Sequence, residues 1–260
     1  PEPFTQLLSQ GMVLKDGAKM SKSKGNTVDP TELITRYGAD TLRFFITFAA
    51  PPEQSLEWSD GGVEGAYRFL KKVWQYAQDN AYLMMHAKYH VPSAQSPFIK
   101  TLSEVHTLLS HIERDLAKQQ LNTVASGSMK LLALLQKVPA DPEHAGLIRL
   151  VFSILLRVLN PICPHITHVL WQHLTLGVEG IENSQWPKPD LNLIAADISV
   201  DIVVQINGKT RGHVNVQSDV DKSTLEQLVM QNDKFKTHLE GKTIKRVIYI
   251  PQKLINVVAV

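Results

Sequence analysis

The sequence is poor in the features that mark secreted, membrane-spanning and strongly charged proteins. One cysteine, Cys163, stands among 260 residues, which excludes a disulfide framework and a cysteine-based zinc finger and fits a reducing compartment. No stretch approaches the ~20 uninterrupted apolar residues of a membrane span, and no basic-then-apolar signal segment opens the chain. The 27 basic and 25 acidic side chains nearly cancel, so net charge alone does not indicate a nucleic-acid partner. These absences predict a cytoplasmic protein without membrane contact.

The sequence does contain enough apolar material for hydrophobic cores. It is 43% hydrophobic and 20% charged, and a prior of ~150 residues per domain suggests about two domains. Residues 177–198 carry four acidic side chains, one basic side chain, two glycines and two prolines, which is typical of a linker. We therefore expect separate segments at residues 1–55, 56–176 and 199–260, with a linker at 177–198.

The first segment combines a lysine-rich loop with two short helices. Residues 14–26 hold four lysines, two glycines and no apolar period. A helix is predicted to start after Asp29 as its N-cap and to end at Gly38. Asp40 can cap a second helix, which the Pro51-Pro52 pair stops.

Residues 61–176 follow the helical period. One apolar stripe has spacings of 4, 3, 4, 3 and 4 and consists of Phe98, Leu102, Val105, Leu109, Ile112 and Leu116. Similar stripes lie before and after it, and Pro161 and Pro164 interrupt the last of them. We expect four or five helices joined by short loops, which is a helical bundle.

After the expected linker, the apolar period changes from 3.6 to 2. The alternating apolar residues are Val200, Ile202, Val204 and Ile206. Asn207-Gly208 then gives a strong hairpin signal, and Ser223 with Glu226 forms a capping box for a helix. A second short helix at 234–240 and strands at 245–250 and 254–260 complete a ββααββ order. The predicted fold class is mainly α, a bundle followed by a small α+β domain.

The most specific feature is the pentapeptide Lys19-Met20-Ser21-Lys22-Ser23. It places two ammonium groups beside small hydroxyls, in a loop bounded by Gly17 and Gly25. Such a loop can fold over a polyphosphate and neutralise charge that develops there. A solvated lysine-rich loop is the alternative that composition leaves open.

The pentapeptide, with Gly25-Asn26 and an N-capped helix after it, resembles the signature loop of class I aminoacyl-tRNA synthetases. Further stretches that resemble this family are Tyr37-Gly38-Ala39-Asp40 and Pro161-Ile162-Cys163-Pro164-His165-Ile166. Those similar to its bacterial leucyl branch include Glu2-Pro3-Phe4, Leu56-Glu57-Trp58-Ser59-Asp60 and Val204-Gln205-Ile206-Asn207-Gly208-Lys209-Thr210-Arg211-Gly212. The resemblance covers nearly the whole chain, but the family's His-x-Gly-His element is absent. The chain is therefore expected to correspond to the C-terminal third of a longer enzyme.

The resemblance implies the chemistry of a ligase that activates leucine with ATP and transfers it to tRNA(Leu). Lys19 and Lys22 would then act catalytically on the triphosphate, and Met20, Ser21 and Ser23 would complete the ATP contact. Mg²⁺ is expected with the ATP. The fragment alone is expected to be inactive, since the nucleotide pocket, the leucine pocket and the editing domain are missing, and the enzyme is expected to be a monomer.

Basic residues near the C-terminus form a second candidate site. Charge alone is about equally compatible with a solvated strand edge and with a surface that contacts RNA phosphates. The resemblance favours RNA, because the family's C-terminal domain contacts the outer corner of tRNA. The predicted RNA-binding residues are Lys209, Arg211, Lys242, Lys245 and Arg246. In the bundle, Arg68, Lys71 and Lys72 recur on one helical face.

Two further groups have ordinary structural explanations. The first has metal-ligand chemistry and consists of Cys163, His165, His168 and His173. No metal site is predicted there, because a lone cysteine is most often a buried small hydrophobe. The second consists of Trp58, Trp74 and Trp171, for which packing is favoured over base stacking. The rival to a ligase fragment is a stand-alone RNA-binding or interaction module without catalysis.

Overall fold

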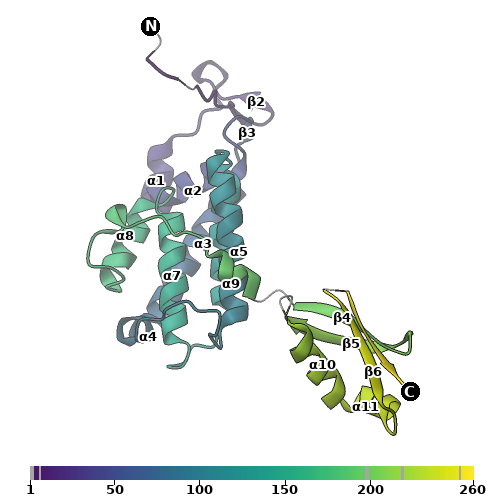
Figure 1. Ribbon diagram of the computed structural model, residues 1–260. Helices are drawn as coiled ribbons and strands as arrows, with labels where there is room; N and C mark the ends of the chain where they lie inside the picture. Colours follow the sequence, from purple (N-terminus) through teal and green to yellow (C-terminus); the bar gives the residue numbers. More distant parts are fainter. Residues whose placement is uncertain (1–2, 6, 197–198, 218–219, 252) are drawn as a thin grey trace. The chain divides into compact units, whose positions relative to one another are not determined.

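The computed structural model describes residues 3–5, 7–196, 199–217, 220–251 and 253–260, so Glu2 of the N-terminal motif lies outside it. The chain forms two compact units, Pro1–Asp190 and Leu191–Val260 (Figure 1). Each unit has its own hydrophobic core. In the described ranges, no helix is both long and apolar enough to cross a membrane.

A small three-stranded sheet carries the lysine-rich loop. β1 (Val13–Lys15) pairs antiparallel with β2 (Ala18–Lys19) and parallel with β3 (Leu56–Glu57), in the order β2-β1-β3. Asp16 and Gly17 turn the chain between β1 and β2 with φ angles of 56° and 71°. This left-handed conformation is what a tight two-residue hairpin turn requires. A short 3-10 helix, η1 (Lys22–Lys24), follows within the loop.

Two helices follow the loop, as the sequence predicts. α1 (Pro30–Tyr37) begins after Asp29, whose carboxylate accepts the Thr31 N–H at 2.8 Å, and it ends at Gly38. α2 (Ala39–Ala49) ends before the two prolines. The prediction that Asp40 caps α2 is wrong, because Gly38 occupies the N-cap position and the Asp40 carboxylate is bonded to a different helix.

The other helices of the first unit form the predicted bundle (Figure 1). Their bounds are α3 (Asp60–Asp79), α4 (Ala81–His86), α5 (Ile99–Ala117), α6 (Leu121–Leu135), α7 (Ala145–Leu159) and α8 (Pro164–His173). The stripe predicted at 98–116 lies on α5, whose Leu102, Val105, Leu109 and Ile112 are buried. Phe44 and Phe45 of α2 belong to the same core. The expected segments 1–55 and 56–176 therefore share one hydrophobic core.

Helices α5 and α6 approach each other closely at a glycine. A Cβ atom built at Gly127 would lie 2.6 Å from Cγ1 of Ile112. Because non-bonded carbon atoms pack at about 3.5–4.0 Å, the two helices can keep this separation only if residue 127 has no side chain.

Residues 177–190 belong to the first unit, which differs from the linker expected at 177–198. Ile181, in η2 (Ile181–Asn183), is buried in the bundle core. The Trp171 indole donates to the Glu179 carbonyl at 2.9 Å, and the Asp190 amide donates to His106 Nδ1 at 3.0 Å. The glycine and proline content of this segment predicts a linker, but these contacts dock residues 177–190 on the bundle. Residues 197 and 198, at the end of the expected linker, lie outside the described residues.

The second unit contains the predicted ββααββ order. Its strands are β4 (Ser199–Ile206), β5 (Lys209–Gln217), β6 (Ile244–Ile250) and β7 (Leu254–Ala259), and its helices are α9 (Leu191–Ala196), α10 (Lys222–Gln231) and α11 (Asp233–Leu239). The strand order is β5-β4-β7-β6, with β4 and β7 parallel and the other pairs antiparallel. Leu225, Val229 and Phe235 of α10 and α11 pack into its core. Figure 1 shows these two helices on one side of the sheet.

In the second unit the predicted hairpin turn is confirmed, but the predicted N-cap of α10 is wrong. Asn207 and Gly208 form the hairpin turn, both with positive φ, at 52° and 75°. The N-cap of α10 is Asp221, whose carboxylate accepts the amides of Ser223 and Thr224. The predicted Ser223–Glu226 capping box is therefore wrong, since the helix starts two residues earlier than that box allows.

Candidate functional site

One asparagine organises the lysine-rich loop. The Asn26 side-chain oxygen accepts the Ser21 amide at 2.9 Å. Its amide nitrogen lies 3.3 Å from the Lys19 carbonyl oxygen and 3.4 Å from those of Lys15 and Ala18. An amide side chain can do this because it carries both donors and an acceptor. Asn26 thereby fastens the end of the loop to the β1–β2 hairpin, a role that the sequence analysis missed.

The loop keeps its charged groups in solvent. Lys19, Lys22 and Lys24 are exposed, and no ion pair involves them among the residues that the structure describes. The hydroxyl oxygens of Ser21 and Ser23 lie 3.2 Å apart, between these lysines in the chain. Within the described residues, the ammonium groups of these lysines are thus not neutralised by an acidic side chain, and the lysines flank the two serines in the chain. Charge-assisted hydrogen bonds to phosphate oxygens are the chemistry that such a loop can supply.

The base of the loop is tied to the sheet and to the bundle. Met20 is half-buried, and its amide donates to the Val13 carbonyl at 3.1 Å. The Gly17 amide donates to a carboxylate oxygen of Glu57 in β3 at 3.1 Å. Trp58, directly after β3, packs edge-on against Phe45 of α2 with ring centroids 5.2 Å apart. These contacts hold the backbone while the lysine side chains extend into solvent.

The Asp40 carboxylate connects α2 to the start of α8. One oxygen lies 2.8 Å from His165 Nδ1, and the other accepts the Ile166 amide at 2.7 Å. Arg43 donates to the carbonyls of Ile162 and Pro161 at 2.8 and 3.1 Å. α8 has no side-chain cap from its own N-cap residue, so Asp40 supplies an acceptor that a helix N-terminus needs. We refer to Asp40 and Arg43 with their partners as the α2–α8 clamp.

Three of the four residues that suggested metal chemistry, Cys163, His165 and His168, make other contacts. Cys163 is buried, its Sγ lies 3.5 Å from the Asp40 carbonyl, and burial raises the pKa of its thiol. His168 Nδ1 lies 3.3 Å from a carboxylate oxygen of Glu182. Across the described ranges, no three His, Cys, Asp or Glu side chains are grouped as a metal ion requires.

The basic residues predicted to bind RNA lie on the edge strands of the second unit. Lys209 and Arg211 are on β5, and Lys245 and Arg246 are on β6. All four are exposed. Edge strands carry unpaired backbone groups, so exposed charge there also discourages pairing with other strands.

The sheet brings the two basic edges to the same end. The Asn207 side chain donates to the Ala259 carbonyl and accepts the Ala259 amide, both at 2.8 Å, which places the hairpin turn beside the end of β7. Arg246 lies opposite Val258 of β7. Lys242 differs from the others, because its ammonium donates to the His238 carbonyl at 3.1 Å. That contact satisfies a carbonyl at the end of α11.

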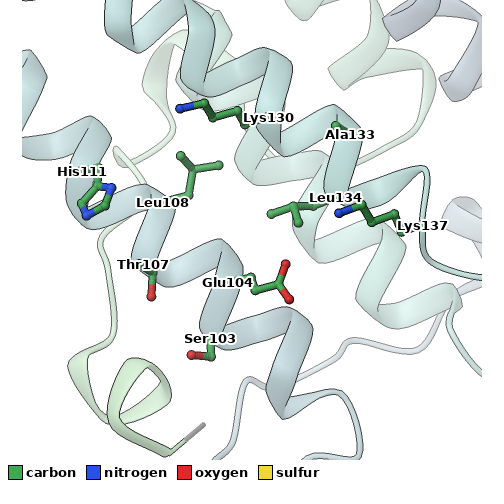
Figure 2. Close-up of a pocket in the computed structure, with 9 residues that line it drawn as sticks. All are labelled: Ser103, Glu104, Thr107, Leu108, His111, Lys130, Ala133, Leu134 and Lys137. Carbon is green, nitrogen blue, oxygen red and sulfur yellow. The ribbon is translucent and has the colours of Figure 1, made fainter. Parts of the chain in front are cut away.

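A groove of about 450 Å³ lies between α5 and α6 (Figure 2). Its floor is apolar and includes Leu108, Ala133 and Leu134, and its polar borders include Glu104, Thr107, His111, Lys130 and Lys137. In Figure 2 the polar ends are spread along the groove rather than gathered at one point. None of these residues belongs to a site predicted from the sequence.

Two family descriptions match parts of the chain. "tRNA synthetases class I (I, L, M and V)" matches residues 1–59, which include the lysine-rich loop. "Anticodon-binding domain of tRNA ligase" matches residues 100–226.

The chain is also similar to curated proteins and to a solved structure. It is 48% identical over 263 residues to the leucine–tRNA ligase of Coxiella burnetii and 48% identical over 258 residues to that of Francisella philomiragia. Both alignments cover 99% of this chain but only 32% and 31% of the relatives, so the chain spans about a third of their length. A LeuRS–tRNA–LeuAMS ternary complex from Agrobacterium radiobacter K84 superposes with a TM-score of 0.69, covering 100% of this chain and 34% of that one. At 24% identity, this similarity supports the fold.

Proposed function

Because the chain belongs to the leucyl branch of the class I aminoacyl-tRNA synthetases, we propose that it supplies the ATP-stabilising loop and tRNA-binding surfaces of a leucine–tRNA ligase. In that reaction the leucine carboxylate attacks the α-phosphorus of ATP and pyrophosphate leaves. The leucyl group of the adenylate then passes to the terminal ribose of tRNA(Leu). The sequence contains no His-x-Gly-His element, so this chain alone is expected not to activate leucine.

In this proposal the loop acts on the leaving pyrophosphate. Negative charge grows on the leaving group as its bond to the α-phosphorus breaks, and a positioned ammonium group stabilises that charge most strongly in the transition state. Lys22 would carry most of this stabilisation and Lys19 would assist it. Ser21 and Ser23 would donate hydrogen bonds to phosphate oxygens, and the half-buried Met20 would hold the loop down.

The observation that carries the proposal is the arrangement of the loop around Asn26. Its side chain bonds the Ser21 amide and contacts carbonyls of the preceding hairpin, whereas the lysine ammonium groups have no acidic partner among the described residues. A fixed backbone with unpaired charge is preorganised, because little reorganisation is needed when the phosphate arrives.

Magnesium would accompany the ATP rather than occupy a site built by this loop. Mg²⁺ is usually held by one or two carboxylates together with substrate phosphates. The loop offers ammonium and hydroxyl groups, and Glu57, the carboxylate at its base, already accepts the Gly17 amide. These residues do not fit a resident metal ion, and no step of the proposal uses one.

The rest of the chain would bind tRNA(Leu) in a monomeric, cytoplasmic enzyme. Residues 1–55 would end the catalytic domain, residues 56–176 would approach the tRNA body, and residues 199–260 would contact it through exposed cations. Those cations are Lys209, Arg211, Lys245 and Arg246, with Lys242 contributing at the end of α11.

Exchange of pyrophosphate into ATP by the complete enzyme tests the role of the loop. Lys22→Ala should lower the rate of leucine activation about 10²–10³-fold, which is typical of losing one charge-stabilising group. The KM for leucine should change little, because the interaction strengthens in the transition state. Lys24→Ala removes another exposed lysine of the same 3-10 helix and serves as the matched control, with near-normal exchange expected.

The melting temperature of both variants should match that of the parent, because both side chains are exposed. A near-normal exchange rate for Lys22→Ala would overturn the proposed role. It would leave a solvated loop, as in a stand-alone RNA-binding or interaction module. A rate loss matched by a lower melting temperature would make Lys22 structural instead.

A further inference from the structure

Aromatic and basic residues alternate along one exposed stripe of α3. Tyr67, Lys71 and Trp74 have the i, i+4, i+7 spacing of a single helix face. The aromatic residues are 39% and 40% exposed, and the lysine between them is also exposed. Single exposed apolar residues are common on protein surfaces, but a cluster of large ones beside a cation is typical of an interaction site.

This stripe borders a groove that reaches α8. Two hollows of about 350 and 560 Å³ share Asp40, Trp74 and Ile166 in their walls, so they adjoin. Tyr67 and Lys71 line the first hollow, and His165 and Val169 line the second. We refer to these two hollows together as the Trp74 groove.

Trp74 differs from Trp58 and Trp171 in how its ring is placed. Trp171 is buried and its indole donates to the Glu179 carbonyl, and the half-buried Trp58 donates to the Asp60 carboxylate at 2.9 Å. The Trp74 indole N–H has no hydrogen-bond partner within the described part of the chain, and its ring forms a wall of the groove. Core packing therefore explains two of the three tryptophans but not Trp74.

The charge around the groove suits a polyanion. The exposed cations are Lys71 in its wall, Arg36, whose Cζ lies 4.8 Å from the ring centroid of the wall residue Tyr37, and Arg68, which follows Tyr67 in the chain. The acidic groups nearby are already bonded, since Asp40 is buried in the α2–α8 clamp and Glu64 accepts the Tyr37 hydroxyl at 3.3 Å. Cations next to exposed aromatic faces are the combination with which proteins hold unstacked RNA bases and their phosphates.

We propose that the Trp74 groove binds tRNA, with an unstacked base or ribose on the Trp74 ring and an adjacent phosphate on Lys71. This inference rests on the proposed function, because it takes tRNA as the polyanion. The competing occupant is another protein segment covering Ile166 and Val169. RNA fits better than a protein segment. An apolar protein segment that covers the groove would remove water from its cations, and the acidic groups of the groove are already bonded elsewhere, whereas RNA brings phosphates that pair with the cations.

Binding of a leucine-tRNA transcript to the 260-residue chain, measured as a function of salt, tests the inference. Trp74→Ala should raise Kd about tenfold, the size expected for one lost base–aromatic stack, and should leave the salt slope unchanged. Trp74→Phe keeps an aromatic face and should restore most of the binding. Lys71→Ala should lower the salt slope by about one, because one phosphate contact is lost. Lys130→Ala, an exposed lysine of the groove in Figure 2, is the matched control and should bind like the parent.

A double variant, Lys209→Ala with Arg211→Ala, separates this inference from the proposed function. If it weakens tRNA binding while Trp74→Ala binds like the parent, the Trp74 groove is not an RNA site and the proposed function stands. If the parent chain does not bind tRNA at all, both proposals are overturned. If Trp74→Ala lowers the melting temperature of the complete enzyme with an unchanged Kd for tRNA, a protein segment covers the groove and the inference is overturned.

Discussion

Replacing Asp40 by alanine removes one carboxylate that serves two helices. Its side chain is only 9% exposed, and it lies in the first turn of α2. It accepts the Ile166 amide at 2.7 Å and lies 2.8 Å from His165 Nδ1, both in the first turn of α8. A carboxylate there also interacts favourably with the positive end of the α8 dipole. In the variant, the Ile166 amide loses its acceptor at a partly buried position.

The two contacts of Asp40 differ in expected magnitude. The His165 side chain is 73% exposed, so that pair contributes at most about 1 kcal/mol. A hydrogen bond to a charged group contributes about 1.5–3 kcal/mol, and a buried donor left unsatisfied costs about 1–3 kcal/mol. Asp40→Ala should therefore lower the free energy of unfolding of the first unit by about 2–3 kcal/mol. In a unit of this length, that corresponds to a Tm lower by about 5–10 °C.

Tryptophan fluorescence during urea unfolding measures this change in the first unit. All four tryptophans lie at or before position 186, and the second unit begins at Leu191. Asp40→Asn keeps one acceptor for the Ile166 amide and should lose about half as much stability as Asp40→Ala. His165→Ala should lose no more than about 1 kcal/mol. The slope m should stay constant, because none of these changes alters the surface exposed on unfolding.

Equal midpoint shifts for Asp40→Ala and His165→Ala would refute the reasoning. They would mean that the Asp40–His165 pair, and not the cap on Ile166, accounts for the whole effect. A shift below about 0.5 kcal/mol for Asp40→Ala would refute it as well, since surface substitutions stay within that range.

Three further predictions concern packing, pH and RNA. In urea unfolding, Gly127→Ala should destabilise the chain by about 1–3 kcal/mol, because the new Cβ would overpack the contact with Ile112. Gly65→Ala is the control, since its Cβ would find no atom closer than 4.0 Å, and it should stabilise α3 by about 0.4–1 kcal/mol. Burial lowers the pKa of His106 from its ordinary 6.5, so the unfolded state binds the proton more readily and stability should fall as pH drops below about 6.5. His106→Asn, which keeps an acceptor, should flatten that pH dependence in urea midpoints measured between about pH 5 and 7. Replacing Lys209 and Arg211 by alanine should weaken tRNA binding and reduce its salt slope by about 1–2 in a titration against salt, and an unchanged slope would exclude the hairpin as a contact.

Local patterns predicted most elements because the interacting atoms lie within a few residues of one another. Asp29 caps α1 through an amide two residues later, and Asn207-Gly208 forms its turn from its own backbone angles. Prediction failed where a distant segment supplied the partner. Asp40 matches a cap for its own helix, but its acceptors are used by a ring and an amide that lie 125 and 126 residues away, respectively. Nothing in the spacing of the sequence encodes that contact.

In the candidate site too, the sequence identifies local patterns but not the contacts that depend on how the chain folds. The pentapeptide is identified by its residue types together with its resemblance to a family signature loop, since composition alone leaves a solvated lysine-rich loop open. The role of Asn26 could not be found in this way, because it depends on how the loop folds back on the hairpin. Trp74 is similar, since its helical stripe resembles those of the other tryptophans and only the folded structure shows its ring exposed at a hollow beside α8.

The contacts of α2 fix the base of the loop on the bundle. Phe44 and Phe45 are part of the bundle core, and Asp40 and Arg43 hold the start of α8. Moving α2 would therefore expose buried aromatic surface and break a buried carboxylate contact, which is costly on both counts. The turn between η1 and α1 is held as well, because the Asn26 side chain accepts the Ser21 amide and its nitrogen lies 3.3 Å from the Lys19 carbonyl oxygen. Binding of a phosphate would accordingly move the exposed lysine side chains of the loop, while the loop backbone, α1 and α2 remain as a fixed base.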